Sequence, residues 1–192
     1  ACRSWKDDYA SLLVETFGEA QGTNVLSEFP DAFPAGYRER FAAHSAVVDM
    51  QHLLSLSGER KLVMSFYQPL ASAEQQLHCK LYHADSPLAL SDVLPILENL
   101  GLRVLGEFPY RLRHQNGREF WIHDFAFTYA EGLDVDIQQL NDTLQDAFVH
   151  IVEGEAENDA FNRLVLTAAM PWRDVALLRA YARYLKQIRL GF

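Results

Sequence analysis

The chain has 192 residues, of which 49% are hydrophobic, and its formal net charge is −9. A chain of this length buries about 70% of the surface of its unfolded form, and the length fits one domain or two small ones. The acidic balance argues against a nucleic-acid partner, because phosphate binding requires a basic face. No apolar run reaches the roughly 20 residues that span a bilayer, so we expect no membrane partner.

The start of the chain and its cysteines predict a cytoplasmic piece of a longer polypeptide. Residues 1–10 lack the charged start and apolar core of a signal peptide, and no initiating Met is present. We therefore expect the chain to be excised from something longer. Cys2 and Cys79 are too few and too far apart to indicate a disulfide framework, and they fit a reducing cytosol.

Residues 1–58 are predicted to be helical. One apolar stripe at helical spacing precedes Gly18, and a second helical run extends from Ala35 to Gly58. We expect this N-terminal helical segment to pack with the remainder of the chain as one compact unit.

The character of the chain changes after this segment, and residues 60–152 predict an α+β domain. Residues 61–69 and 77–84 alternate between apolar and polar side chains, as strands do. A short turn carrying Pro87 follows. These features predict two strands followed by a connection into a helix.

The predicted helix opens at Ser91 and Asp92 and closes at Gly101. Pro95 then falls within the first turn, where its missing N–H does little harm. The strand, turn and helix, with the strand that follows, have the size of a βαβ unit.

Two further strands and a helix complete the domain. Residues 102–112 and 120–129 predict strands, with a hairpin turn at 114–117. The second of these strands is apolar on both faces, which predicts a central position in the sheet. A helix with one apolar stripe starts at about Asp136. The predicted fold is α+β, with a four-stranded antiparallel sheet built by two ββα units and covered by helices.

Residues 153–192 are predicted to return to helix. Pro171 is well placed to open the last helix. The apolar seam expected for that helix consists of Val175, Leu178, Ala182 and Leu185.

Charge is unevenly distributed near the end of the chain. Residues 131–159 hold nine acids and no Lys or Arg, whereas residues 173–189 hold five basic residues and one acid. Arg179, Arg183 and Lys186 share one face of the last helix. This face is either simply solvated, because exposed charge pairs contribute little, or it is an interaction face that docks on the acidic stretch or on another domain.

Neither a catalytic nor a metal-binding residue is predicted. His123 and Asp124 invite a catalytic interpretation, but adjacent strand residues point to opposite faces. No Ser or Cys nucleophile lies beside them in the sequence, so we expect structural hydrogen bonds. The other histidines lack the tight spacing of a zinc set.

Four stretches carry a resemblance to a known family: AFPAGYRERFAAHSAVVDMQHL (32–53), LSDVLPILENLGLRVLGEFPY (90–110), WIHDF (121–125) and EAENDAFNRLVLTAAMPWRDVALLRAYARYLKQ (155–187). In this order they resemble the large bacterial NAD-specific glutamate dehydrogenases. The resemblance runs over nearly the whole chain. It implies an internal piece upstream of the catalytic domain, where the family carries ACT-like and helical regulatory segments. It also implies an ACT-like (ferredoxin-like) sheet in which residues 61–67 supply the strand that usually comes last.

The resemblance implies that the parent oxidises L-glutamate to 2-oxoglutarate and ammonium with NAD. No G-x-G-x-x-G turn is present in this chain, and no lysine lies in a glycine-rich context. We therefore expect no cofactor in this segment and NAD elsewhere in the parent. The partners expected are other domains and subunits of the parent, and an exposed edge strand would favour a homo-oligomer.

An effector site is a further implication of the resemblance. The turn after residue 84 lies where ACT domains often hold a small ligand, typically an amino acid. Its candidate residues are Asp85 and Ser86, with Asp85 taking an α-amino group, and the N–H groups near Ser91 and Asp92 would take a carboxylate. Many such loops have a glycine after the proline, where this chain has Leu88. A purely structural turn therefore stands beside the effector interpretation.

The predicted function is a non-catalytic regulatory or scaffolding segment, divided into residues 1–58, the ACT-like residues 60–152, and residues 153–192. The first alternative is an amino-acid sensor. A second, less favoured alternative is an unrelated small hydrolase built around His123 or Asp124.

Overall fold

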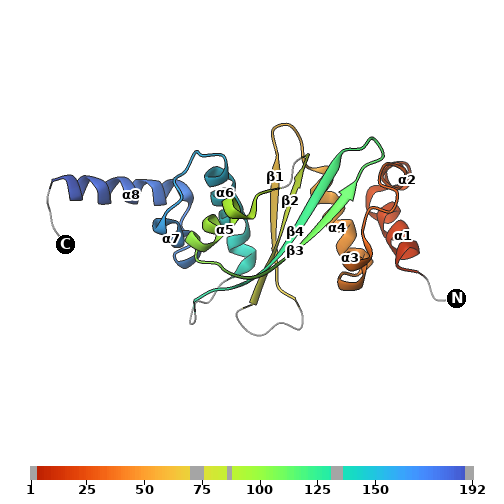
Figure 1. Ribbon diagram of the computed structural model, residues 1–192, viewed down its shortest axis with the longest axis horizontal. Coiled ribbons are helices and arrows are strands. Elements are labelled where there is room, and N and C mark those ends of the chain that lie inside the picture. The colour runs from red at the N-terminus through yellow and green to blue at the C-terminus, as the bar shows by residue number, and fades with distance from the viewer. Residues whose placement is uncertain (1–3, 70–75, 86–87, 131–135, 189–192) are drawn as a thin grey trace. The chain divides into compact units, whose positions relative to one another are not determined.

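A computed structural model describes residues 4–69, 76–85, 88–130 and 136–188, with the side chains of residues 137–139 left undescribed. All structural statements below concern these residues. Their helices and strands are, in chain order, α1 (Trp5–Phe17), α2 (Glu19–Glu28), α3 (Ala35–Arg40), α4 (Ala43–Leu54), β1 (Leu62–Tyr67), β2 (Gln76–Ala84), α5 (Leu90–Asn99), β3 (Arg103–Arg113), β4 (Glu119–Thr128), α6 (Ile137–Val152), the 3-10 helix η1 (Ala160–Asn162), α7 (Arg163–Thr167) and α8 (Trp172–Gln187) (Figure 1).

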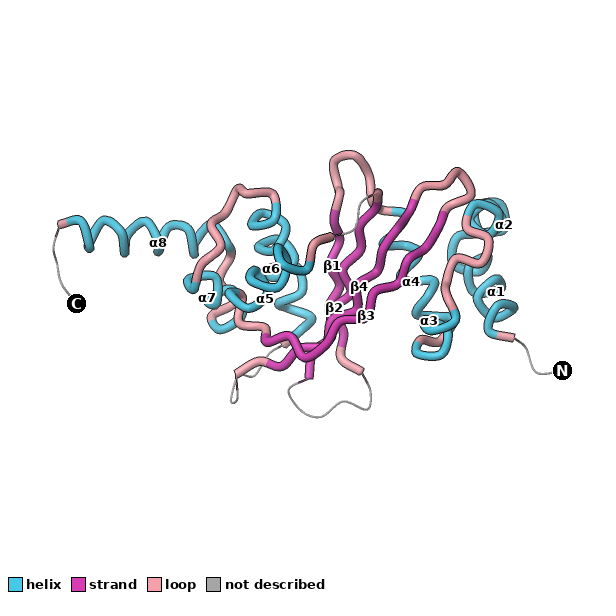
Figure 2. The backbone as a smooth tube through the Cα atoms, in the orientation of Figure 1, coloured by secondary structure: helices cyan, strands magenta, loops and turns pink. Residues whose placement is uncertain are grey.

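The strands form one four-stranded sheet in the order β1-β2-β4-β3 (Figure 2). Helix α5 connects β2 to β3, and β4 lies between those two strands, which is the split βαβ arrangement of ferredoxin-like sheets. The chain order ββαββα and the α+β class predicted from the sequence are confirmed. The central position predicted for β4 is also confirmed, because β4 has a neighbour on each side.

The chain divides into two compact units, each of which takes part of every strand. The first unit comprises residues 1–64, 80–87 and 108–124, and the second comprises residues 65–79, 88–107 and 125–192. Each unit is described by itself below. The predicted division at residues 58–60 and 152–153 stays a prediction.

In the first unit, the N-terminal helices are set by local chemistry. Ser4 and Asp7 form a capping box at the start of α1, since each side chain accepts a hydrogen bond from the other residue's backbone N–H. Helix α1 ends at Gly18, whose φ of 83° favours glycine. Gly22 then lets α2 approach α1 closely, because a Cβ there would lie 2.7 Å from the Cα of Val14.

An aromatic cluster fills the core between these helices and the strands of the first unit. Tyr37 is fully buried, with its ring centroid 4.5 Å from that of Phe33, 4.7 Å from that of Phe41 and 5.2 Å from that of Tyr110. Aromatic rings bury more apolar surface than most side chains, so these contacts contribute strongly to the stability of the unit. Tyr37 and Phe41 of this cluster contact the buried charged side chains Asp49 and Lys80, which are described below.

In the second unit, α5 and α6 pack through their apolar stripes. Leu97 of α5 and Leu144 and Phe148 of α6 have no exposed surface, which confirms the stripe predicted for α6. The N–H of Phe66 on β1 donates to Asn141 Oδ1 at 3.1 Å and so joins the strand to α6. Gly101 ends the α5 region with φ of 93°.

Two sequence predictions about helices were wrong. Helix α5 begins at Leu90 rather than at Ser91, with Ala89 in the N-cap position, so Pro95 lies beyond the first turn. The seam predicted for α8 does not pack as a unit, since Val175 is buried but Leu178 and Ala182 are exposed. Periodicity identifies apolar stripes, but neighbouring elements decide which stripe is covered.

Candidate functional site

The predicted effector turn begins at Asp85, which lies at the surface of the first unit. Its backbone has φ of 75°, a strained value for a residue with a side chain, and its N–H donates to the carbonyl of Glu119 at 2.9 Å. Arg118 donates two hydrogen bonds to the carboxylate, from Nε to Oδ1 at 2.7 Å and from Nη2 to Oδ2 at 2.9 Å. This guanidinium lowers the pKa of the Asp85 carboxyl. Asp85 therefore already has a cationic partner, which the sequence had not suggested.

The remaining effector candidates were Ser86, Ser91 and Asp92. Ser86 lies outside the described residues. Ser91 and Asp92 belong to the second unit, in the first turn of α5, where Ser91 Oγ donates to Asp92 Oδ1 at 3.3 Å. The N–H of Asp92, which was expected to receive a ligand carboxylate, donates instead to the carbonyl of Ala89 at 3.0 Å. The effector site itself stays a prediction.

A buried charge cluster occupies the first unit, and sequence reasoning had missed it. Asp49 on α4 is 2% exposed and Lys80 on β2 is 4% exposed. Lys80 Nζ lies 2.6 Å from Asp49 Oδ2, and the hydroxyl of Tyr82 donates to Asp49 Oδ1 at 2.9 Å. The hydroxyl of Tyr37 also donates to Asp49. Lys80 Nζ lies 3.7 Å from the centroid of the Phe41 ring, a cation–π contact.

The chemistry of this cluster favours a structural role. A catalytic lysine must lose its proton and reach a substrate. Lys80 instead faces a carboxylate that stabilises its charge, and almost none of its side chain is exposed. The pair holds α4 against β2, because separating two buried charges from each other is costly. The signals in the sequence were an acid beside the apolar residues of a helical run and a lysine directly between Cys79 and Leu81 of a strand.

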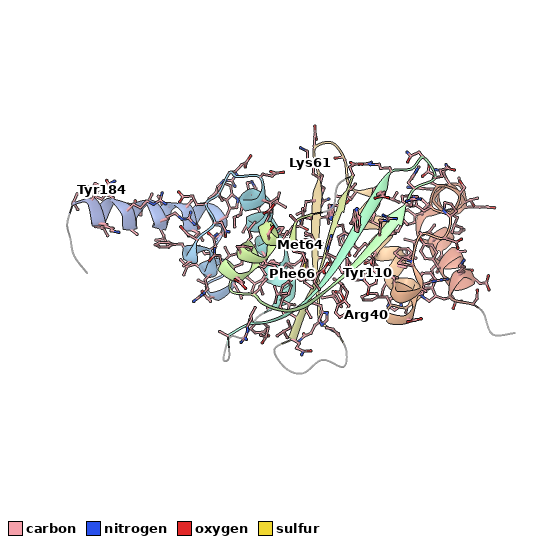
Figure 3. All side chains as sticks on the ribbon, viewed as in Figure 1. Arg40, Lys61, Met64, Phe66, Tyr110 and Tyr184 are labelled. Carbon is pink, nitrogen blue, oxygen red and sulfur yellow. The ribbon has the colours of Figure 1, made fainter. Side chains whose placement is uncertain are left out.

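His123 and Asp124 make separate contacts, as expected for neighbours on a strand. The Nε2 atoms of His123 and His83 lie 2.9 Å apart, so one ring donates and the other accepts. Asp124 Oδ2 lies 3.2 Å from Arg40 Nη2. The guanidinium of Arg40 also covers the ring of Phe108, at 3.8 Å from its centroid, and Figure 3 labels Arg40 in this region. The hydrogen bond of His123 and the ion pair of Asp124 fit structural roles.

The predicted interaction face of α8 pairs largely with acids of the same chain. Arg179 is 4% exposed and binds both carboxylate oxygens of Asp159, at 2.6 and 2.9 Å. Its hydrogen bonds lower the pKa of Asp159. Arg183 Nη1 donates to Glu157 Oε1 at 2.7 Å, and this bond raises the pKa of Arg183. Lys186 is exposed. Both acids belong to the acidic stretch identified in the sequence.

Each unit also has a concave site. A cavity of about 100 Å³ in the first unit is lined by residues that include the aromatic side chains of Trp5, Tyr9 and Phe33, with Lys6 and Asp31 beside them. An open groove of about 420 Å³ in the second unit is lined by residues that include Glu98, Arg103 and Arg163. Within the described residues, no three His, Cys, Asp or Glu side chains gather closely enough to hold a metal ion. None of the described helices is both long and apolar enough to cross a membrane.

Three family models match the chain in succession. Residues 12–56 match glutamate dehydrogenase helical motif 2, residues 61–140 match the glutamate dehydrogenase ACT3 domain, and residues 156–192 match glutamate dehydrogenase helical motif 3. The chain is 86% identical over all 192 of its residues to the NAD-specific glutamate dehydrogenase of Pseudomonas aeruginosa. This chain belongs to the NAD-specific glutamate dehydrogenase family.

Two further glutamate dehydrogenases extend the comparison. The chain is 46% identical to the NAD-specific glutamate dehydrogenase of Halomonas elongata over 189 residues, which cover 98% of this chain. It is 27% identical to that of Mycobacterium tuberculosis over 195 residues, which cover 97% of this chain. It spans 12% of the length of each of these relatives. The family resemblance inferred from the sequence is confirmed. Residues 61–140, matched by the ACT3 model, contain the four strands and α5.

Proposed function

We propose that this chain is a non-catalytic regulatory and scaffolding segment of a cytoplasmic NAD-dependent glutamate dehydrogenase. The parent would oxidise L-glutamate to 2-oxoglutarate and ammonium, with NAD held by other parts of the polypeptide. The segment would connect domains or subunits and would transmit their state to the catalytic part.

The observation that carries this proposal is the succession of family models. All three are named for an ACT domain or a helical motif, and together they account for most of the chain. The geometry is consistent with such a role. The buried charged groups Asp49, Lys80 and Asp124 contact one another or neighbouring side chains, and these contacts stabilise the fold.

The edge strand β3 supports a role in contacts between domains or subunits. It has a neighbour on one side of the sheet, and Leu105 and Phe108 on it are 53% and 44% exposed. An exposed edge with apolar side chains favours pairing with another chain or domain.

The scaffolding role is tested with Leu105→Arg in the full-length parent. We expect smaller assemblies in sedimentation velocity, because a charge on the edge strand opposes its pairing. Val48→Arg is a matched control, since Val48 is 47% exposed but lies on a helix. Unchanged assembly for Leu105→Arg would contradict scaffolding through this edge.

The second candidate function is an amino-acid sensor, and the exposed pair of Asp85 and Arg118 favours it. A free amino acid carries one charge of each sign, so its ammonium can bind Asp85 while its carboxylate binds Arg118. The positive φ of Asp85 marks a strained turn, which is often found at ligand sites.

Effector titrations of the full-length parent with arginine, aspartate and glutamate test this candidate. Asp85→Asn and Arg118→Gln are each expected to abolish the response of the rate to the effector while leaving the basal rate unchanged. Asp31→Asn is the matched control, because Asp31 also has a positive φ, of 54°, and an exposed lysine partner. Equal responses in all variants would exclude a sensor at this turn.

A further inference from the structure

Helix α8 carries an apolar stripe that no described residue covers. We name Leu177, Tyr181 and Tyr184 of the helix, together with its C-cap residue Ile188, the α8 outer face; they are 54%, 56%, 58% and 47% exposed. Single exposed apolar side chains are ordinary, but a contiguous stripe of large ones marks an interaction site.

The spacing puts these four residues on one side of the helix. Successive intervals of four, three and four residues follow the repeat by which helices pack against each other. The opposite side of α8 holds its two buried residues, Val175 and Arg179.

Contacts on the buried side determine where the outer face points. The ring of Trp172 stacks on His150 of α6 with centroids 4.3 Å apart, and Arg179 binds Asp159 and Asn162 beside η1. Beyond these contacts α8 extends away from α6 and α7 (Figure 1), and Tyr184 lies on this extended part (Figure 3). The arginine contacts therefore fix the helix so that its outer face is presented outward.

The composition of this face is typical of a protein interface. Two of its four members are tyrosines, which are enriched at protein interfaces because one end is apolar and the other polar.

The size of the relatives indicates what covers this face. The chain makes up 12% of their length, so most of such a polypeptide lies outside these residues. A surface on the same polypeptide has a millimolar effective concentration, which a free second copy at micromolar concentration does not reach.

We propose that the α8 outer face docks in an apolar groove formed by another part of the same full-length dehydrogenase. The inference rests on the proposed function and names one contact through which this segment connects to the remainder of the enzyme. The occupant must offer an apolar channel wide enough for two tyrosine rings, with polar groups at its rim for their hydroxyls.

Hydroxyl-radical footprinting with peptide mass spectrometry tests the docking directly. Oxidation of Tyr181 and Tyr184 is compared between the isolated chain and the full-length parent. We expect these two rings to be oxidised several-fold more slowly in the parent, because a ring buried in a groove is shielded from the radical. Tyr37, which is fully buried, is the internal reference and should react slowly in both. Equal oxidation of Tyr181 and Tyr184 in the isolated chain and in the intact, active parent would overturn the proposal.

A double variant separates docking from a general loss of structure. Leu177→Gln with Tyr181→Gln keeps good helix formers in α8 but removes half of the apolar face. In the full-length parent we expect oxidation of Tyr184 to rise to its level in the isolated chain. Lys186→Gln is the matched control, because Lys186 is exposed on the opposite side of the helix. Tyr184 that stays protected in the double variant would contradict docking through this face.

Three outcomes of these experiments have distinct meanings. Protection of Tyr184 that grows with the concentration of the isolated chain, together with dimers in sedimentation, would replace the internal groove by a second copy. Turnover of glutamate by the isolated chain would refute the proposed function, whatever the footprint. Equal footprints with an inactive isolated chain would refute the docking alone.

Discussion

The buried pair of Asp49 and Lys80 supplies the sharpest stability prediction. Lys80→Met retains the volume and apolar stem of the side chain but removes its charge. Asp49 is then left at 2% exposure without the charge of Lys80, and the hydroxyls of Tyr37 and Tyr82 still donate to it. Removing one partner of a buried ion pair costs about 3–5 kcal/mol of unfolding free energy. We therefore expect a loss of that size for Lys80→Met.

The double variant Asp49→Asn with Lys80→Met should recover part of this loss. Its amide can still accept the hydrogen bond of Tyr82, and no unpaired charge is left. The two substitutions are expected to couple by about 1–3 kcal/mol, since the effects of substitutions at residues in direct contact are not additive. The wild type, the two single variants and the double variant form a double-mutant cycle. Urea unfolding of the isolated chain, followed by tryptophan fluorescence, measures the free energy of unfolding of all four.

The exposed pair of Lys6 and Asp31 is the control for this cycle. Its side chains are 58% and 78% exposed, so water and salt screen the charges. Lys6→Met is expected to leave the urea midpoint unchanged. A Lys80→Met variant as stable as Lys6→Met, or a double variant that loses the sum of the single losses, would refute the reasoning about the buried pair.

Two further predictions concern pH and helix packing. Burial lowers the pKa of His52 in the folded chain. Below pH 6.5 the unfolded chain therefore binds more protons at His52 than the folded chain does, and the free energy of unfolding falls as the pH decreases. The test compares the free energy of unfolding at pH 7.5 and at pH 5.5, about one unit on either side of pH 6.5. The difference between the two should be smaller in His52→Gln than in the wild type. It should be the same as in the wild type in the control His44→Gln, whose side chain is exposed. Gly22→Ala should cost about 1–3 kcal/mol in urea unfolding, because its Cβ would lie 2.7 Å from the backbone of α1. Gly36→Ala, with no atom within 4 Å of the added Cβ, should be neutral or stabilising, and equal losses in both variants would contradict the close packing of α1 and α2.

The elements of the sheet were predictable because their signals are local. Residues 61–69 and 77–84 alternate with a period of two, and the strand at 120–129 is apolar on both faces. The burial of Met64 and Phe66 in β1 and of both faces of β4 agrees with these patterns, whereas β2 is buried on both faces, which alternation does not predict. The apolar stripe of α6 was recognisable for the same reason, since Leu140, Leu144 and Phe148 recur at helical spacing.

The charged pairs were not predictable in the same way. Asp49 and Lys80 are 31 positions apart, and Asp85 and Arg118 are 33 apart, so their meeting depends on the fold and not on local spacing. The start of α5 was misplaced because Ser91 and Asp92 are good capping residues, yet Ala89 takes the cap. The seam of α8 failed because the sequence offers two apolar stripes, and only the buried side chain of Val175 shows which side packs.

The most direct test of a non-catalytic role is an assay of the isolated chain for NAD binding and glutamate oxidation. We expect calorimetry to detect no binding of NAD, and the absorbance of NADH not to rise when glutamate is added, while the full-length parent does both. Stoichiometric binding of NAD to the isolated chain, or turnover of glutamate by it, would contradict the role proposed for this segment.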